Sequence, residues 1–238
     1  PSALHQKGYD VVLVRHDDHL TIEYQMDSYE REKQERLLFS KYYLVNHLTE
    51  NYLTINPSDI RLDSYLDLSQ ITTLFNSKPD SFEKGLYLHG NIGIGKTYLM
   101  AAYTNQMAKL GYTVSFVNMS RLLNEIKQTF GLKDNREFEN LMNKLTNSDL
   151  LVIDDIGAES VTSWSRDEIL FTILDNRMQA QKMTCFTSNL NKEELESFYL
   201  NAGSVIDEIK LDRLMERFNV LSNFFELVSK NGSFRRAR

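Results

Sequence analysis

A glycine-rich segment between an apolar run and a helix-like run constrains this chain most. Residues 90–97, Gly-Asn-Ile-Gly-Ile-Gly-Lys-Thr, fit the pattern G-x-x-x-x-G-K-[ST]. The apolar run 85–89 before them predicts a buried strand, and the run from Tyr98 onward has apolar residues at helical spacing. A strand, a glycine loop and a helix in this order form the context that a phosphate-binding loop requires. The segment therefore predicts a nucleoside triphosphate site.

Each residue type in this segment suits a triphosphate. The glycines leave backbone N–H groups open to an anion, and the N-terminus of the following helix adds positive partial charge. We expect Lys96 to reach the β- and γ-phosphates and Thr97 to bind Mg²⁺. The predicted nucleotide-binding residues are Gly90, Asn91, Ile92, Gly93, Ile94, Gly95, Lys96, Thr97 and Tyr98. An ordinary glycine-rich turn with a chance Lys-Thr pair is the alternative, which the flanking strand and helix disfavour.

A second apolar run ends in two carboxylates. Residues 150–153 are Leu-Leu-Val-Ile, which is typical of a buried parallel strand, and Asp154 and Asp155 follow. Ligands of an open α/β sheet lie beyond the carboxyl ends of its strands, so this pair is expected beside the phosphate loop. We predict that Asp154 helps to hold Mg²⁺ and that Asp155 orients or deprotonates the attacking water. A strand followed by an acidic turn without chemistry is the alternative.

Strand-like runs alternate with helix-like segments through most of the chain, which predicts a parallel α/β sheet flanked by helices. Five strands are expected, at 85–89, 113–118, 150–154, 183–188 and 224–228. Asn189 follows the fourth of them, next to the acidic pair, where it could contact the γ-phosphate or the attacking water.

The N-terminal section has a different pattern. The runs 9–15 and 20–24 predict a hairpin with a polar turn, and the stretch 28–48 has helix-like spacing. We therefore divide the chain into a small α+β appendage with its connecting helix, residues 1–54, and a nucleotide-binding domain, residues 55–238.

Composition excludes several classes of protein. The 238 residues include one cysteine, Cys185, so neither a disulfide framework nor a cysteine-based zinc site can form within the chain. We expect a reducing, cytoplasmic setting and no membrane association, because no apolar run is long enough to span a bilayer. The formal net charge of −6 disfavours strong general affinity for duplex DNA.

Several motifs occur together in a fixed order. Besides the phosphate loop, these are residues 154–160 (DDIGAES), which begin with the acidic pair, 164–168 (WSRDE), 187–189 (TSN), 212–217 (DRLMER) and 232–236 (GSFRR). With these motifs, residues 55–238 resemble the AAA+ P-loop ATPase domain of bacterial replicative helicase loaders of the DnaI/DnaC type. The resemblance implies ATP and Mg²⁺ as cofactors and the hexameric replicative DNA helicase as partner, in primosome assembly at replication initiation or restart.

The resemblance also assigns roles to single residues. It implies that Asn189 is the sensor 1 residue and that Arg217 is an arginine finger, with Arg213 as the second candidate. Such a finger acts on nucleotide held by a neighbouring subunit, which implies self-association and weak ATPase activity in the isolated monomer. A surface ion pair with Asp212 or Glu216 is the alternative for both arginines.

Single-stranded DNA is a further partner that the resemblance implies. A modest basic surface with one aromatic ring could contact it: Lys127, Phe130, Lys133, Arg136 and Lys144. Arg235 and Arg236 resemble the basic motif that ends these domains, and a solvated basic tail explains them equally well.

The chain departs from the family in its N-terminal section. Loaders of the DnaI type carry a cysteine-containing zinc module there, and no cysteine precedes Cys185. We therefore expect a fragment from which that module is missing. The alternative function is a transposition helper ATPase of the IstB type, which shares the same core; a metabolic P-loop kinase fits less well, because it would need a lid over an acceptor substrate.

Overall fold

The computed structural model describes residues 9–16, 19–27, 30, 33, 34, 37, 40–81, 83–130, 134–201 and 208–234. Contacts divide the chain into two compact units, Pro1–Lys41 and Tyr42–Arg238. The division falls earlier than the predicted boundary after residue 54. The reason is that β3 (Tyr43–Asn46) joins the main sheet and α2 (Glu50–Leu53) packs on α4 (Lys96–Lys109).

The first unit contains the predicted hairpin. Strand β1 (Tyr9–His16) pairs antiparallel with β2 (His19–Met26), and Leu13 lies opposite Ile22. Because side chains alternate across a strand, this register collects most of the apolar residues of both strands on one face. The described residues between 30 and 40 are helical, as the spacing predicted.

The second unit is built on a six-stranded parallel sheet with the order β3-β5-β6-β7-β4-β8. Its other strands are β4 (Gly85–His89), β5 (Val114–Asn118), β6 (Leu150–Ile156), β7 (Met183–Ser188) and β8 (Ser222–Glu226). The central strands are buried along almost their whole length, which explains their near-continuous apolar sequences. The strand before the phosphate loop, β4, lies between β7 and β8, so the ends of β7 and β6 follow at successive positions along the sheet edge.

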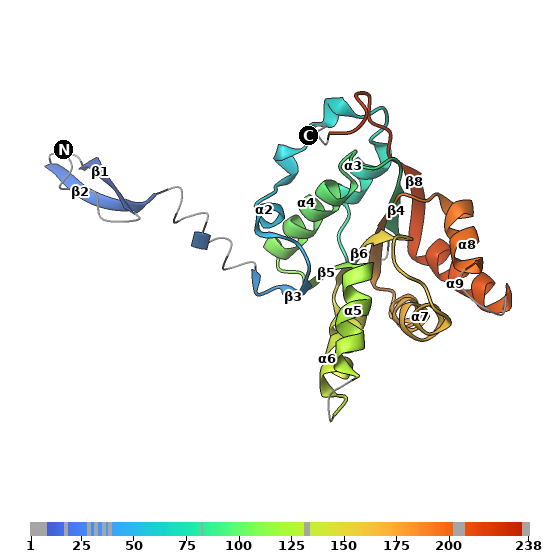
Figure 1. Ribbon diagram of the computed structural model, residues 1–238. Coiled ribbons are helices and arrows are strands. Elements are labelled where there is room, and N and C mark those ends of the chain that lie inside the picture. Colours follow the sequence, from blue (N-terminus) through green and yellow to red (C-terminus); the bar gives the residue numbers. More distant parts are fainter. Residues whose placement is uncertain are drawn as a thin grey trace. The chain divides into compact units, whose positions relative to one another are not determined.

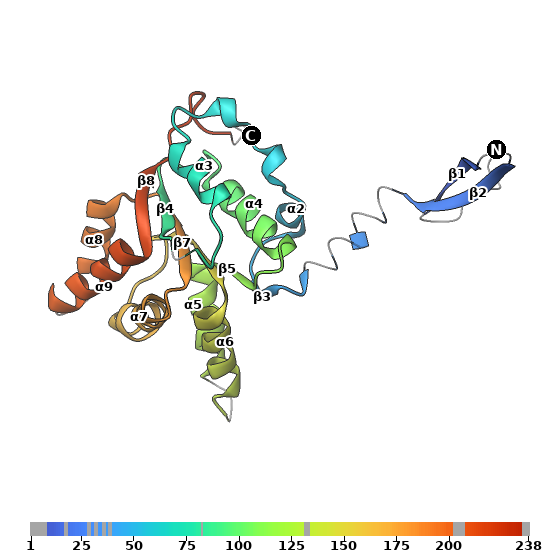
Figure 2. The same ribbon diagram turned by 180° about the vertical axis from the view of Figure 1, so that it is seen from behind.

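Helices cover both faces of this sheet (Figures 1 and 2). One face carries α2, α4 and α3 (Ser69–Asn76), with two short 3-10 turns, η1 (Pro57–Asp59) and η2 (Leu62–Ser64). The other face carries α5 (Met119–Thr129), α6 (Arg136–Asn147), the π-helical turn η3 (Ser165–Leu170), α7 (Phe171–Gln179), α8 (Lys192–Leu200) and α9 (Glu208–Leu221). None of the described helices is long and apolar enough to cross a membrane.

Two sequence-based expectations need correction. The sheet has six strands and not five, because residues 43–46 form β3 although their spacing fitted a helix through residue 48. A four-residue edge strand is fixed by its pairing with β5, some seventy positions later in the chain, and local periodicity does not reveal such a partner. The last strand covers residues 222–226 rather than 224–228, in register with β4.

Candidate functional site

The phosphate loop connects the end of β4 at His89 to the start of α4 at Lys96. Gly95 caps α4 with a φ of 94°, in the left-handed region, so a side chain there would strain the backbone. A side chain at Gly90 would place its Cβ 2.5 Å from the carbonyl oxygen of Leu227. The helix N-terminus leaves its first N–H groups without intrahelical partners, which makes this loop suited to an anion.

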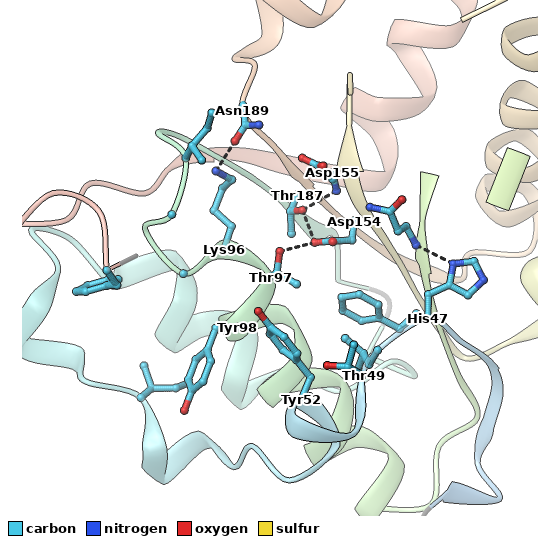
Figure 3. Close-up of a pocket in the computed structure, with 18 of the residues that line it drawn as sticks. His47, Thr49, Tyr52, Lys96, Thr97, Tyr98, Asp154, Asp155, Thr187 and Asn189 are labelled. Atoms are coloured by element: carbon cyan, nitrogen blue, oxygen red, sulfur yellow. Dashed lines mark hydrogen bonds between the residues drawn. The ribbon is translucent and has the colours of Figure 1, made fainter. Parts of the chain in front are cut away.

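Lys96 joins the phosphate loop to the residue that follows β7. Lys96 is only 8% exposed, and its ammonium group donates hydrogen bonds to Gly90 O at 2.7 Å, to Asn91 O at 2.9 Å and to Asn189 Oδ1 at 2.8 Å. Figure 3 shows this lysine reaching up to Asn189. The structure thus brings the predicted phosphate-binding lysine and the predicted sensor residue into direct contact.

Asp154 lies near the end of β6, beside the first turn of α4. Its Oδ1 accepts hydrogen bonds from Thr97 Oγ1 at 2.8 Å and from Thr187 Oγ1 at 2.7 Å (Figure 3). Burial raises the pKa of the Asp154 carboxyl, and the two threonine hydroxyls act in the opposite direction. A carboxylate and a hydroxyl at this distance are oxygen ligands of the kind that Mg²⁺ prefers, so the donor set of Thr97 and Asp154 fits the metal.

Asp155 is held in an unusual backbone conformation next to this pair. Its φ is 59°, in the left-handed region, and the pairing of β6 with β7 shifts register between Ile153 and Ile156. The N–H of Asp155 donates to Thr187 Oγ1 at 2.9 Å. Such local strain re-aims a side chain at the end of a strand. Asp155 accordingly lines the cavity in front of the phosphate loop.

A cavity of about 870 Å³ extends from this site. Lys96, Thr97, Asp154, Asp155 and Asn189 all line it. Away from the loop it is lined mainly by residues that follow β3, belong to α2, end or follow η1, or begin α4: His47, Leu48, Thr49, Tyr52, Asp59, Ile60, Arg61 and Tyr98. Tyr65 and Phe234 line it as well. This volume accommodates a nucleoside in addition to its phosphates.

Aromatic rings face the far part of the cavity. Tyr52 and Tyr98 meet edge to face with ring centroids 6.5 Å apart, and both are labelled in Figure 3 below the acidic pair. His47, which follows β3, accepts the N–H of Asn118 at Nδ1 and contacts Glu125 through Nε2 at 3.0 Å. Burial lowers the pKa of His47. Sequence patterns carried no signal for the lining residues after β3, because β3 itself was not expected.

Both arginine-finger candidates lie on α9 and are not among the described lining residues of the cavity. Arg217 is 12% exposed at its side chain and forms ion pairs with Asp175 at 2.8 Å and with Glu216 at 2.6 Å. Arg213 is exposed and stacks over the ring of Phe171 at 4.9 Å. The ion-paired arrangement weighed for Arg217 is therefore present, and Arg213 is the more accessible of the two.

Of the remaining candidates, Lys127 lies on α5, Phe130 directly follows α5, and Arg136 and Lys144 lie on α6. Phe130 is 57% exposed and meets Trp164 edge to face at 5.1 Å, while Arg136 pairs with Asp134 at 3.1 Å. Lys133, Arg235 and Arg236 lie outside the described residues. Thr187 was noted in the sequence only as part of a triplet, and the structure shows that its hydroxyl binds both residues of the acidic pair.

The chain is similar to a known protein family and to several named relatives. A model of the IstB-like ATP binding protein family matches residues 16–236. The replicative helicase loader DnaI of Bacillus subtilis (strain 168) is 33% identical over 232 residues, which are 94% of this chain and 73% of that protein. The replicative helicase loader DnaC of Escherichia coli (strain K12) is 33% identical over 122 residues, 51% of this chain and 48% of that protein.

Solved structures give the same fold. A crystal structure of DnaI superposes with a TM-score of 0.68 and 29% identity, covering 79% of this chain and 98% of that one. The DnaC helicase loader superposes with a TM-score of 0.60 and 21% identity, over 76% of this chain and 100% of that one. The initiator DnaA bound to AMPPCP and single-stranded DNA gives 0.59 and 18%, over 76% and 51%. The predicted AAA+ P-loop fold is confirmed.

Proposed function

This chain belongs to the IstB-like ATP binding protein family, and from that premise we propose that it is an ATP- and Mg²⁺-dependent loader of the hexameric replicative DNA helicase. The observation that carries the proposal is the site in which Lys96, Asn189, Thr97 and the two aspartates meet. The similarity to DnaI along 94% of the chain supports the choice of helicase loading among the activities that such a site could serve.

ATP would compete for the ammonium group of Lys96. This group now binds two loop carbonyls and Asn189 Oδ1, and it is the cation expected at the β- and γ-phosphates. When phosphates engage Lys96, Asn189 would be released to contact the γ-phosphate or the attacking water. The Lys96–Asn189 contact thus provides a path by which nucleotide binding at the loop reaches the end of β7 and the helices that follow it.

Hydrolysis would place each carboxylate in a separate role. Mg²⁺, held by Thr97 and Asp154, would supply charge neutralisation at the phosphate oxygens. Asp155 would orient the attacking water and accept its proton. Arg213 or Arg217 of a neighbouring subunit would stabilise charge on the transferred group, so turnover by a lone chain should be weak. The protein would act as a switch between an ATP state that holds the helicase and a state that releases it.

The direct experiment is sedimentation of this chain with the replicative helicase of the same organism, with and without Mg·ATP. We expect a discrete complex whose stability depends on nucleotide. The Lys96→Ala variant should lose nucleotide binding, and with it the nucleotide dependence. Absence of any complex in both conditions would contradict the loading role. A parallel run with single-stranded DNA tests whether DNA is a second partner.

The matching family model carries the name of IstB-like proteins, which favours a transposition helper ATPase as the second candidate. Such a helper would form a complex with a transposase on DNA and would not bind the helicase. Running both partners against the same preparation separates the two functions, since the nucleotide site is common to them.

A further inference from the structure

Two hydrogen-bond donors from outside the phosphate loop bind its backbone carbonyls. The N–H of Phe234 donates to Gly93 O at 2.9 Å, and the hydroxyl of Tyr65 donates to Ile94 O at 3.0 Å. The donors come from segments far apart in sequence, one before β4 and one after β8. Both residues line the cavity, but their donor groups bind loop carbonyls, so their contribution to the site needs a separate explanation.

The two donors are held in place by each other and by the backbone. The Tyr65 and Phe234 rings meet edge to face with centroids 5.8 Å apart. Tyr65 forms an isolated antiparallel bridge with Ser229, and Leu66 N donates to Val228 O at 3.0 Å. The chain after β8 is thereby fastened to the segment around Tyr65 along several residues. Tyr65 is only 6% exposed, so its hydroxyl has a fixed position.

Fixing these carbonyls also fixes the N–H groups of the loop. In a planar trans peptide the C=O of one residue and the N–H of the next point in opposite directions. With Gly93 O held by Phe234, the N–H of Ile94 is turned the other way, and with Ile94 O held by Tyr65, the N–H of Gly95 follows the same rule. Phosphate binding by such a loop depends on convergent N–H groups. The hydrogen bonds from Phe234 and Tyr65 therefore orient the N–H groups of Ile94 and Gly95.

We propose that Tyr65 and the C-terminal segment ending at Phe234 are positioning residues of the phosphate loop, which set its N–H groups before nucleotide arrives. This inference rests on the proposed nucleotide site. A preformed loop avoids the conformational cost of ordering on binding, so the two hydrogen bonds contribute to nucleotide affinity through the shape of the loop. The space around Gly95 supports this arrangement, because a Cβ there would lie 2.7 Å from the Tyr65 hydroxyl and 3.8 Å from the Phe234 ring.

The first test is the Tyr65→Phe variant, which keeps the ring and removes the donor. We expect ATP and ADP to bind about two- to tenfold more weakly, the effect of one hydrogen bond. Amide hydrogen exchange of the peptide covering residues 90–97 should rise in the nucleotide-free protein. The matched control is Tyr112→Phe, which removes a hydroxyl bonded to Asp80, away from the loop. Unchanged affinity and unchanged loop exchange in Tyr65→Phe would overturn the proposal.

The second test separates the hydrogen bond of Phe234 from the charge of the basic tail. A chain ending at Phe234 keeps the donor and loses Arg235 and Arg236, whereas a chain ending at Ser233 loses both. We expect the first truncation to bind ATP within about twofold of the intact chain and the second to bind several-fold more weakly with faster loop exchange. Equal losses in both truncations would assign the effect to charge and reject the positioning role.

Two measurements, ATP affinity and amide hydrogen exchange of the phosphate loop, distinguish this inference from the proposed function. If the intact chain and its Lys96→Ala variant bind ATP equally poorly, the nucleotide site itself is wrong. The exchange measurement on nucleotide-free protein still reports whether Tyr65 and Phe234 order the loop. If Lys96→Ala abolishes binding while the Tyr65 and Phe234 variants bind and exchange as the intact chain does, the site stands and the positioning role fails.

Discussion

Replacing Asp154 by asparagine separates the stability of this protein from the proposed binding of Mg²⁺. Asp154 is 7% exposed, and burial raises the pKa of its carboxyl. Because its pKa is raised in the folded state, this carboxyl contributes its full stabilisation at pH values below its unfolded pKa, near 3.8. That contribution is lost as the pH rises through the folded-state pKa. At neutral pH the ionised group is therefore a cost to folding. An asparagine side chain at this position would carry no charge at any pH.

The magnitude follows from the two hydroxyls that Asp154 binds. Thr97 and Thr187 donate to the same oxygen, at 2.8 and 2.7 Å, and the amide oxygen of asparagine can accept both. The nucleotide-free Asp154→Asn protein should thus be as stable as the intact chain at pH 7, or more stable, and its advantage should shrink toward pH 4. Asp154→Ala, the control, leaves two donors without an acceptor and should lose about 2–4 kcal/mol.

Asp154→Asn should keep the stability of the nucleotide-free protein but lose the extra stability that Mg²⁺ gives in the presence of ATP. At ATP near 100 times its dissociation constant, linkage gives about 2.7 kcal/mol, or roughly 5–11 °C in Tm for a chain of this length. We expect the intact chain to gain most of this shift only when Mg²⁺ is present, and Asp154→Asn to show no Mg²⁺-dependent part. Thermal unfolding across pH, with ATP and with Mg·ATP, measures both effects. An Asp154→Asn protein destabilised without nucleotide by more than about 1 kcal/mol, or one that keeps the Mg²⁺-dependent shift, would refute the reasoning.

Four further variants test other parts of the structure. Arg213→Ala should abolish partner-stimulated ATP turnover with little change in stability. Arg217→Ala should also lower the urea midpoint, because it leaves Asp175 without its ion pair. Equal turnover in Arg213→Ala and the intact chain would exclude an arginine-finger role for Arg213. Arg177→Met should cost about 2–4 kcal/mol in urea unfolding, because it leaves the carbonyl oxygens at the end of α6 that bind the fully buried guanidinium without donors. A loss below about 1 kcal/mol would contradict this. Asn189→Ala should reduce turnover roughly 100-fold while ATP affinity stays within a few fold, and unchanged steady-state turnover would remove it from the chemistry.

Local patterns in the sequence were sufficient to predict the position of the phosphate loop and of the acidic pair, because the same residues determine both secondary structure and chemistry there. The phosphate loop needs glycines for its backbone and a Lys-Thr pair for its ligands, so its sequence predicts both its shape and its role. The acidic pair was placed correctly beside the loop because the ends of parallel strands share one edge of the sheet. The contact between Lys96 and Asn189 follows from the same logic, since β4 and β7 are neighbours in the sheet.

Features that depend on distant parts of the chain could not be predicted. Strand β3 exists because its backbone pairs with β5, and its four residues fit a helical spacing equally well. Tyr65 and Phe234 reach the phosphate loop only after the chain beyond β8 has returned to lie beside the segment before β4. The pairing of Arg217 with Asp175 joins α9 to α7, which sequence spacing alone could not reveal.

Thr187 shows how a single side chain can connect the two halves of the acidic pair. Its hydroxyl donates to Asp154 Oδ1 and accepts the N–H of Asp155, whose backbone has a positive φ. The same threonine lies at the end of β7, two residues before Asn189, and Asn189 binds Lys96. A shift of the end of β7 on nucleotide binding would therefore act on Asp154, the proposed metal ligand, and on Asp155, the proposed water-orienting carboxylate, together. Because one strand end carries both contacts, occupancy of the loop and readiness for hydrolysis are expected to change in concert.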